Sequence, residues 1–219
     1  MTVSRNDIND MPEHTQLSDR ILDQALELAE AHSWEAVRLH TVADALQIGL
    51  DDVHRCYAQK DDLVEAWFDR ADRTMLAIAN EYSGLPQQER IENVIMDWLL
   101  ALSRYRRVTR QMLMYKLEPG HFHLQVLGLM RISRTVQWIR EAARLETGGL
   151  RRIIEEISLT KIYLAVFSRW LFDDSTEYEH TRSLLGRLLR CHERCKKLGV
   201  VLPGWPAQTR RNGTQRAGL

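Results

Sequence analysis

Apolar residues recur at intervals of three and four positions along most of the chain. That spacing places them on one face of an α-helix, whereas a half-buried strand would alternate apolar and polar residues. Five prolines and 11 glycines are few for 219 residues. Several of them mark breaks in the pattern at 83–86, 118–120 and 148–149, and the polar run 173–175 marks a fourth. The pattern therefore predicts an all-α fold.

Four helices are expected before the first break. Ser18 is the expected N-cap of a first helix that ends near residues 32–33. Two short helices follow over 39–46 and 50–57, and a long helix begins at Lys60. Beyond residue 86, helices are expected over 87–107, 108–117, 123–145, 150–172 and 176–198.

The last two predicted helices have the most regular apolar spacing. In each of them the intervals between apolar positions alternate between three and four residues, which is typical of coiled-coil packing. Such a helix can bury one face within its own chain and a second face against another copy. Packing within a single chain and a four-helix interface between two copies are both consistent with this pattern.

Charge is distributed unevenly along the chain, although the formal net charge is zero. Residues 1–63 contain 5 Lys/Arg and 13 Asp/Glu, whereas the remaining 156 residues contain 25 and 17. The first part is therefore acidic, which opposes contact with nucleic acid there. The composition, 44% hydrophobic and 27% charged, is that of a folded globular protein.

The cysteines and the N-terminus indicate a cytoplasmic protein. Cys56, Cys191 and Cys195 form neither a disulfide framework nor a zinc-type CxxC pair, and such usage fits a reducing compartment. Residues 1–16 are polar and acidic and lack the apolar core of a signal peptide. No stretch of about 18 apolar residues predicts a membrane span. We expect residues 1–16 and 201–219 to be disordered.

The segment 21–63 combines several apolar and aromatic positions in one register. They are the ILxxAxxL pattern of the first helix, an aromatic after it, a Val-Ala pair, an apolar turn residue, and the exit pattern aromatic-x-x-Lys-x-x-Leu: Ile21, Leu22, Ala25, Leu28, Trp34, Val42, Ala43, Ile48, Val53, Tyr57, Lys60 and Leu63. With these residues the segment resembles the helix-turn-helix domain of the TetR family of transcriptional regulators. The resemblance implies a three-helix DNA-binding head over 17–63 and a helical ligand-binding and dimerisation body over 64–200.

The resemblance also implies that the third helix lies in the major groove of double-stranded operator DNA. Phosphate contacts are then expected from the cationic positions Arg38, His40, Arg55 and Lys60. The expected base-facing positions are Leu50, Asp51, Asp52 and His54, and Thr41 is suited to either role.

This head departs from the family pattern at several positions. Gln47 replaces the usual turn glycine, His54 replaces the usual tyrosine of the third helix, and Leu50 occupies a position that is often lysine. From 17 to 63 there are 4 basic and 10 acidic residues, whereas a DNA-binding module normally presents a basic face. Asp51 and Asp52 at a helix N-terminus have a simpler explanation, because they stabilise the helix dipole.

For the body, the resemblance favours a homodimer that responds to a small apolar or lipid-like ligand. The expected dimer-interface residues are Ile157, Leu164, Leu184, Leu188, Cys191 and Cys195. The cysteines lie on the leucine seam, which favours buried thiols that act as small apolar residues. The ligand cavity is expected to be lined by aromatic and methionine side chains, although ordinary core packing explains any one of them: Trp98, Met112, Met114, Tyr115, Met130, Trp138, Phe167 and Trp170.

A second resemblance supports a different class of protein. The segment 168–189, SRWLFDDSTEYEHTRSLLGRLL, is similar to the C-terminal part of a ubiquinone-biosynthesis accessory family. That family has a TetR-like fold and binds lipid instead of DNA. The alternative is therefore a lipid- or isoprenoid-binding protein without DNA affinity. A head that binds another protein through its acidic surface is a third possibility.

Catalysis and metal binding have little support in the sequence. The chain contains no G-x-S-x-G, P-loop, dinucleotide-binding glycine pattern or H-E-x-x-H, so we expect no enzyme and no cofactor. His121 and His123 have a spacing that two metal ligands can use, but no carboxylate or cysteine cluster completes a set. The arginines 104, 106, 107 and 110 are explained most simply as a solvated helix end, and a ligand anion is the alternative.

Overall fold

The computed structural model describes residues 5–117 and 122–197, with side chains over 14–115 and 130–196, and every regular element in this part of the chain is helical. This confirms the all-α prediction. The helices are α1 (Arg5–Ala31), α2 (Leu39–Leu46), α3 (Leu50–Cys56), α4 (Lys60–Ile78), α5 (Gln87–Ala101), α6 (Arg106–Leu117), α7 (Phe122–Ala142), α8 (Gly149–Trp170) and α9 (Glu179–Lys197). Short 3₁₀ helices lie at Ala79–Tyr82, Ser103–Tyr105 and Thr176–Tyr178. The expected tail 201–219 lies outside the described residues.

The head is held together by the apolar face of α1. Ile21, Leu22, Ala25 and Leu26 are at most 1% exposed, and they pack with the buried Val53 of α3 and other core residues of the head. The exit residue Tyr57 is also buried, and its hydroxyl donates to the Ser18 carbonyl 3.0 Å away. The apolar pattern over 21–63 thus forms the core of three packed helices.

The first helix begins much earlier than the sequence suggested. α1 starts at Arg5, so the expectation of a disordered arm over 1–16 is corrected for its helical part. Ser18 is not an N-cap, because its hydroxyl donates to the His14 carbonyl at 2.9 Å, four residues back along the helix. That bond is the usual one for a serine inside a helix.

The turn between α2 and α3 accommodates Gln47 where a glycine is expected. Gln47 has φ 56° and ψ 41°, the left-handed conformation that ends many helices. Its amide donates to the Asp44 carbonyl, and the Ile48 amide donates to the Ala43 carbonyl, both at 3.1 Å. These bonds terminate α2 and set the direction of α3.

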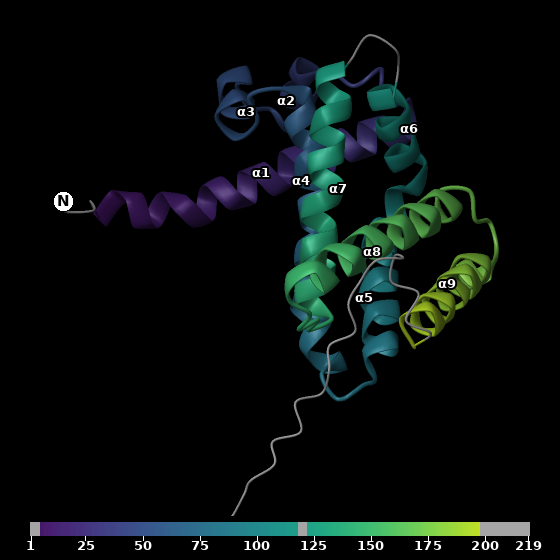
Figure 1. The fold of residues 1–219 in the computed structure, drawn as a ribbon. Helices are drawn as coiled ribbons and strands as arrows, with labels where there is room; N and C mark the ends of the chain where they lie inside the picture. The colour runs from purple at the N-terminus through teal and green to yellow at the C-terminus, as the bar shows by residue number, and fades with distance from the viewer. Residues whose placement is uncertain (1–4, 118–121, 198–219) are drawn as a thin grey trace, which may run out of the picture.

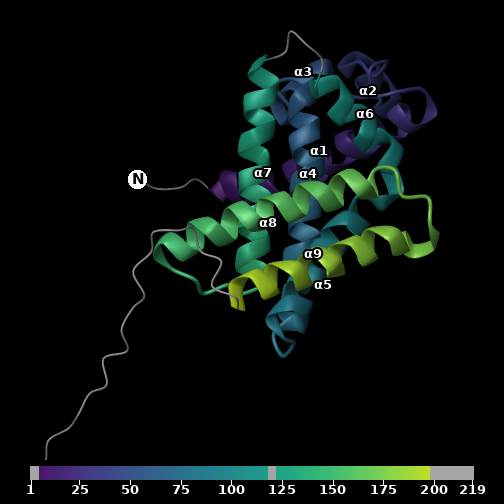
Figure 2. The same ribbon diagram turned by 45° about the vertical axis from the view of Figure 1, so that its right-hand side comes forward.

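The body is built around α4, which continues from the head into the core. α4 packs against α5 and α7, and α8 packs against α9 (Figures 1 and 2). Both views show α7 alongside α4, with α8 crossing them and α9 beside α8. No helix among the described residues is long and apolar enough to cross a bilayer.

An aromatic cluster fills the interior of the body. Ring centroids of neighbouring members lie 5.4 to 6.3 Å apart, and the members are Phe68, Trp98, Tyr163, Phe167 and Trp170. Burying one side chain of this size stabilises the folded state by about 1.5–3 kcal/mol, because the side chain is removed from water. The cluster therefore joins α4, α5 and α8 into one core.

A polar clamp fixes the turn between α8 and α9. The fully buried Asp173 carboxylate accepts hydrogen bonds from the Thr181 amide at 2.7 Å and from the Thr181 and Ser175 hydroxyls at 2.6 Å. Burial opposes ionisation of Asp173, but these hydrogen bonds outweigh it and hold its pKa below the usual range. Arg106 on α6 donates to the Asp173 carbonyl and pairs with Asp174 at 2.6 Å. Arg106, one of the four clustered arginines, thereby ties α6 to this turn.

Candidate nucleic-acid interface

A groove lies beside α3, on the side of this helix that carries Leu50 and His54. It has a volume of about 620 Å³ and is lined by residues of the α1–α2 turn, α2, α3, α4 and α6: Glu35, Val37, Arg38, Leu39, His40, Leu50, Val53, His54, Tyr57, Lys60 and Tyr115. α3 packs against α1 and α2, and its outer face remains exposed, with Leu50 at 53%. The described residues of the body leave this face of the helix expected to read DNA uncovered.

Five of the nine expected DNA-binding residues meet at this groove. They are Arg38, His40, Leu50, His54 and Lys60. The other four, Thr41, Asp51, Asp52 and Arg55, do not line it; Thr41 is exposed on α2 and the other three are on α3. The fold thus divides the expected set into a groove with several cations and an outer helix face with two carboxylates.

Arg55 is paired within its own helix. Its guanidinium lies 3.7 Å from the Asp51 carboxylate and also forms an ion pair with Asp52. Asp52 in addition accepts from the Gly49 amide at 2.9 Å, which completes a cap at the start of α3. Asp52 is therefore placed as a helix-capping residue, and a contact between Arg55 and phosphate competes with these two ion pairs.

Lys60 forms bonds with the main chain of the α1–α2 turn. Its Nζ donates to the Trp34 carbonyl at 2.6 Å and to the Glu35 carbonyl at 3.3 Å. The ammonium also lies 4.9 Å from the centroid of the Trp34 ring and 5.9 Å from that of Tyr115. Burial, followed by repulsion from Arg38, lowers the pKa of Lys60 to about 8. Two of its three donors are thus engaged, which leaves one N–H for a phosphate.

Helix α6 connects the groove with the body. The Trp34 amide donates to Gln111 Oε1 at 2.7 Å, and Arg107 Nε lies 3.4 Å from Glu30 Oε1. Tyr115, also on α6, lines the groove itself. The same helix therefore contacts the α8–α9 turn through Arg106 and the head through these side chains.

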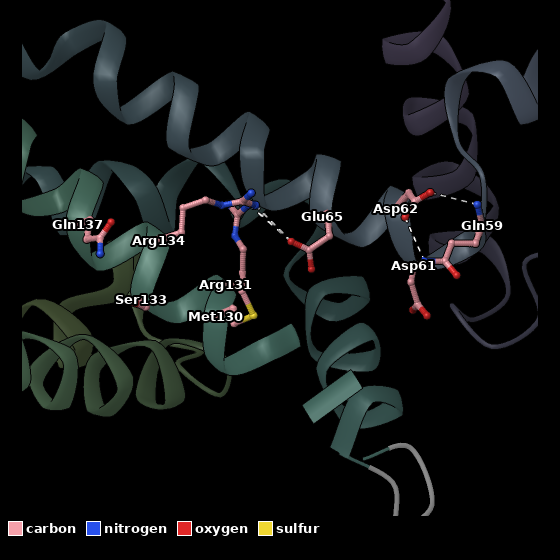
Figure 3. A pocket seen from close by; sticks show the side chains of 9 residues that line it. All are labelled: Gln59, Asp61, Asp62, Glu65, Met130, Arg131, Ser133, Arg134 and Gln137. Atoms are coloured by element: carbon pink, nitrogen blue, oxygen red, sulfur yellow. Dashed lines mark hydrogen bonds and ion pairs between the residues drawn. The ribbon is translucent and has the colours of Figure 1, made fainter. Parts of the chain in front are cut away.

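A second groove, of about 590 Å³, lies between α4 and α7 (Figure 3). Arg134 spans the gap between the two helices, with Nη2 3.3 Å from Glu65 and 2.9 Å from Asp69. Farther along α4 in Figure 3, Asp62 accepts from the Gln59 amide at 3.1 Å. The ion pairs of this groove join α4 to α7.

A buried ion pair lies behind this groove. Arg131 Nη2 is 2.7 Å from Asp72 Oδ2, and the two side chains are 7% exposed each. Asp72 Oδ1 accepts from the Trp98 indole at 2.7 Å and from the Thr135 hydroxyl at 3.3 Å. Burial raises the pKa of Asp72, and Arg131 opposes that rise. We did not foresee this cluster, although acids at 65, 69 and 72 share one helix face and were a usable signal.

The eight residues expected to line a ligand cavity do not gather around one space. Four of them, Trp98, Met112, Phe167 and Trp170, are buried in the core, whereas Met114, Met130 and Trp138 are 49%, 66% and 44% exposed. The eighth, Tyr115, lines the groove of the head. The expected wall is corrected accordingly, because residues of the same type occur in the core and on the surface.

The expected dimer-interface residues lie on α8 and α9, which pack against each other. Ile157 is 52% exposed and Leu164 37%, and their neighbour Ile153 is 52% exposed. On α9, Leu184 and Leu188 are half-buried. Cys191 and Cys195 are exposed in the single chain, so the expected burial of their thiols requires a second copy.

No group of three or more potential metal ligands occurs among the residues whose positions are described. The His121 and His123 side chains lie outside the described residues.

Comparison with known proteins relates the whole arrangement to one family. The chain is similar to a TetR transcriptional regulator from Nitrosomonas europaea ATCC 19718, with 45% identity and a TM-score of 0.74 over 82% of this chain and 99% of that one. It also shares its fold with a TetR transcriptional regulator from Rhodococcus sp. RHA1, with 19% identity and a TM-score of 0.61 over 81% and 96% of the two chains. No family model and no curated protein matches the sequence.

Proposed function

Because the chain belongs to the TetR family of transcriptional regulators, we propose that it binds double-stranded operator DNA as a homodimer and responds to a small apolar ligand. The observation that carries the DNA-binding proposal is the groove beside α3, where the cationic Arg38 and Lys60 lie together with His40 and His54. Cationic side chains around an exposed helix are the arrangement that positions a head on the phosphate backbone.

The proposed roles follow from the positions around α3. α3 enters the major groove, and Arg38 and His40 contact the phosphate backbone beside it. We assign a phosphate contact also to His54, in place of the base-facing role expected from the sequence, because it lines the same groove. Leu50, which is 53% exposed at the start of α3, offers an apolar surface to a thymine methyl group. Lys60 holds the α1–α2 turn and contributes one remaining donor, and Thr41 on α2 can donate to either a phosphate or a base.

Dimerisation would combine α8 and α9 of two copies into a four-helix interface. The exposed apolar side chains Ile153, Ile157 and Leu164 lie on α8 beside α9. An apolar row of this kind is normally covered in the assembled protein. The interface would fix the spacing of two reading helices on successive turns of the operator.

The ligand response is proposed to act through α6. This helix contacts the α8–α9 turn through Arg106 and the head through Gln111 and Tyr115. A ligand that separates the aromatic cluster of the body would shift α6 and so change the spacing of the heads. Such a coupling is typically about 1–3 kcal/mol.

A lipid-binding protein without DNA affinity is the second candidate. The observation that favours it is the pairing of Arg55 with Asp51 and Asp52, which leaves surplus negative charge on the reading helix. Negative charge on this face opposes the approach of phosphates.

One experiment separates the two candidates. Binding of the purified protein to a labelled duplex from the region upstream of its own gene is measured between 50 and 200 mM salt. The regulator proposal expects binding that weakens steeply as salt rises, because phosphate contacts release counterions. Absence of binding at the lowest salt, together with a lipid found by native mass spectrometry, would support the carrier and overturn the regulator.

A further inference from the structure

We infer that DNA binding by this protein is coupled to proton uptake by His40 and His54. The inference rests on the proposed function, because it names a regulation of the same groove. His40 lies at the start of α2 and His54 in the middle of α3, and both imidazoles are exposed and line the groove. An imidazole gains its proton in the pH range of about 6 to 7, close to that of cells.

The groove has little fixed positive charge without the histidines. Among the ionisable groups that line it, Arg38 and Lys60 are cationic and Glu35 is anionic, and the phenols Tyr57 and Tyr115 are neutral at this pH. Protonation of both imidazoles would raise the formal charge of the lining from one positive charge to three. The two histidines therefore provide half of the cationic groups that this groove can present.

Among the described residues, α2 and α3 do not supply that charge from elsewhere, and His14 of α1 lies beside Arg55 and Cys56, outside the lining of the groove. On α3, Arg55 is already paired with Asp51 and Asp52. On α2, the exposed ionisable residue apart from His40 is Asp44. Arg55, Asp51, Asp52 and Asp44 together carry net negative charge, so protonated imidazoles would increase the attraction between the groove and a phosphate. By linkage, a ligand that prefers the protonated form makes protonation more favourable in return.

Lys60 sets the pH window in which the effect can be measured. Its pKa is lowered to about 8, so it also loses charge above that pH. Between pH 6.0 and 7.4 Lys60 stays mostly protonated, so a change of affinity within this range is not caused by Lys60. A comparison within this window therefore separates the imidazoles from Lys60.

The test measures the dissociation constant of the full-length protein for a labelled duplex from its own upstream region at pH 6.0 and 7.4. The wild type should bind about tenfold more tightly at pH 6.0, since each proton taken up gives up to a tenfold change per pH unit. At pH 6.0 the slope of log K against log salt should also be steeper by about 0.9 for each protonated imidazole. His40→Gln with His54→Gln should remove most of both effects.

His32→Gln is the matched control, because this exposed histidine follows α1 and does not line the groove. It should keep the pH dependence of the wild type, and circular dichroism should show that all variants are folded at both pH values. Equal affinity of the wild type at pH 6.0 and 7.4, or the same pH dependence in the double variant, overturns the inference and leaves the regulator proposal intact. Absence of DNA binding at every pH overturns both.

Discussion

Asp72 and Arg131 form a buried ion pair that joins α4 to α7, with 2.7 Å between Asp72 Oδ2 and Arg131 Nη2. Asp72 also receives the Trp98 indole N–H, so the pair is connected to the aromatic cluster of the body. α4 starts in the groove at Lys60 and carries Asp72 three turns later. The head and the core of the body thus share one helix that is fixed at both places.

Replacing one partner of this pair should be costly. Asp72→Asn leaves the buried Arg131 guanidinium with the more exposed carboxylates of Asp69 and Glu65, and we expect a loss of about 3 kcal/mol in the free energy of unfolding. Urea denaturation monitored by circular dichroism measures this loss. In the double variant with Arg131→Met the loss should be smaller than the sum of the two single losses, because no lone charge remains. Additive losses would show that the two side chains do not interact.

The Asp173 clamp predicts a pH-dependent stability. Its pKa is lower in the folded chain than the reference value of 3.8, so its contribution is complete well above pH 3.8 and is lost as the pH falls below that value. Asp173→Ala leaves the Ser175 and Thr181 donors without their acceptor, and we expect a loss of about 2 kcal/mol at pH 7.

Thermal or urea unfolding at pH 7 and at pH 3 checks this prediction. The difference in stability between the wild type and Asp173→Ala should shrink at pH 3, because the carboxylate is then largely protonated in the unfolded chain while it stays ionised in the folded chain, so that folding must release a proton. The exposed Asp174→Ala serves as a control for the loss of a neighbouring carboxylate. A difference that is the same at both pH values would contradict the proposed role of ionised Asp173.

The sequence predicted those features that depend on neighbouring residues. The limits of α2 and the start of α4 at Lys60 agree with the expected positions, because apolar spacing and turn residues are local signals. The start of α1 was missed, because the polar segment before Ser18 has no apolar periodicity that predicts a helix. The partners of Lys60 were also missed, since the carbonyls that it binds are 25 and 26 residues away in sequence.

The eight residues expected to line a ligand cavity do not come together in the structure, for a related reason. An aromatic residue on a predicted helix is equally suited to a core, a cavity or a surface, and its rotation about the helix decides which of these it joins. Trp98 and Trp138 were assigned to the same wall, yet Trp98 is 1% exposed in the aromatic cluster and Trp138 is 44% exposed. Packing between helices that are distant in sequence determines this difference.

The proposed dimer predicts how charge on α8 affects assembly. Ile157→Glu places a carboxylate on a side chain that is 52% exposed in the single chain, so the fold should tolerate it. If Ile157 is covered by a second copy, the buried charge should convert the dimer into monomers. Leu188→Glu on α9 should act in the same direction, although this half-buried residue also supports the chain's own core.

Sedimentation equilibrium or size-exclusion chromatography with light scattering measures the molecular mass of these variants. Leu100→Glu is the matched control, because Leu100 is 40% exposed on α5 and is not part of the proposed interface. It should remain a dimer. A dimeric Ile157→Glu variant would place the interface on another surface.

The pairing of Arg55 with Asp51 predicts a gain of DNA affinity when the acid is removed. Asp51→Asn deletes a negative charge from the exposed face of α3 and releases Arg55 from one of its two ion pairs. We expect binding to a duplex to tighten by about threefold to tenfold near 100 mM salt, with a salt slope that is steeper by about 0.9 if Arg55 gains one phosphate contact. Fluorescence anisotropy measures both quantities. Glu89→Gln makes the same change of charge at an exposed residue of α5 and should have little effect. If Asp51→Asn instead weakens binding to one sequence and not to others, Asp51 contacts a base, since a carboxylate that accepts from cytosine contributes specificity at a cost in backbone attraction.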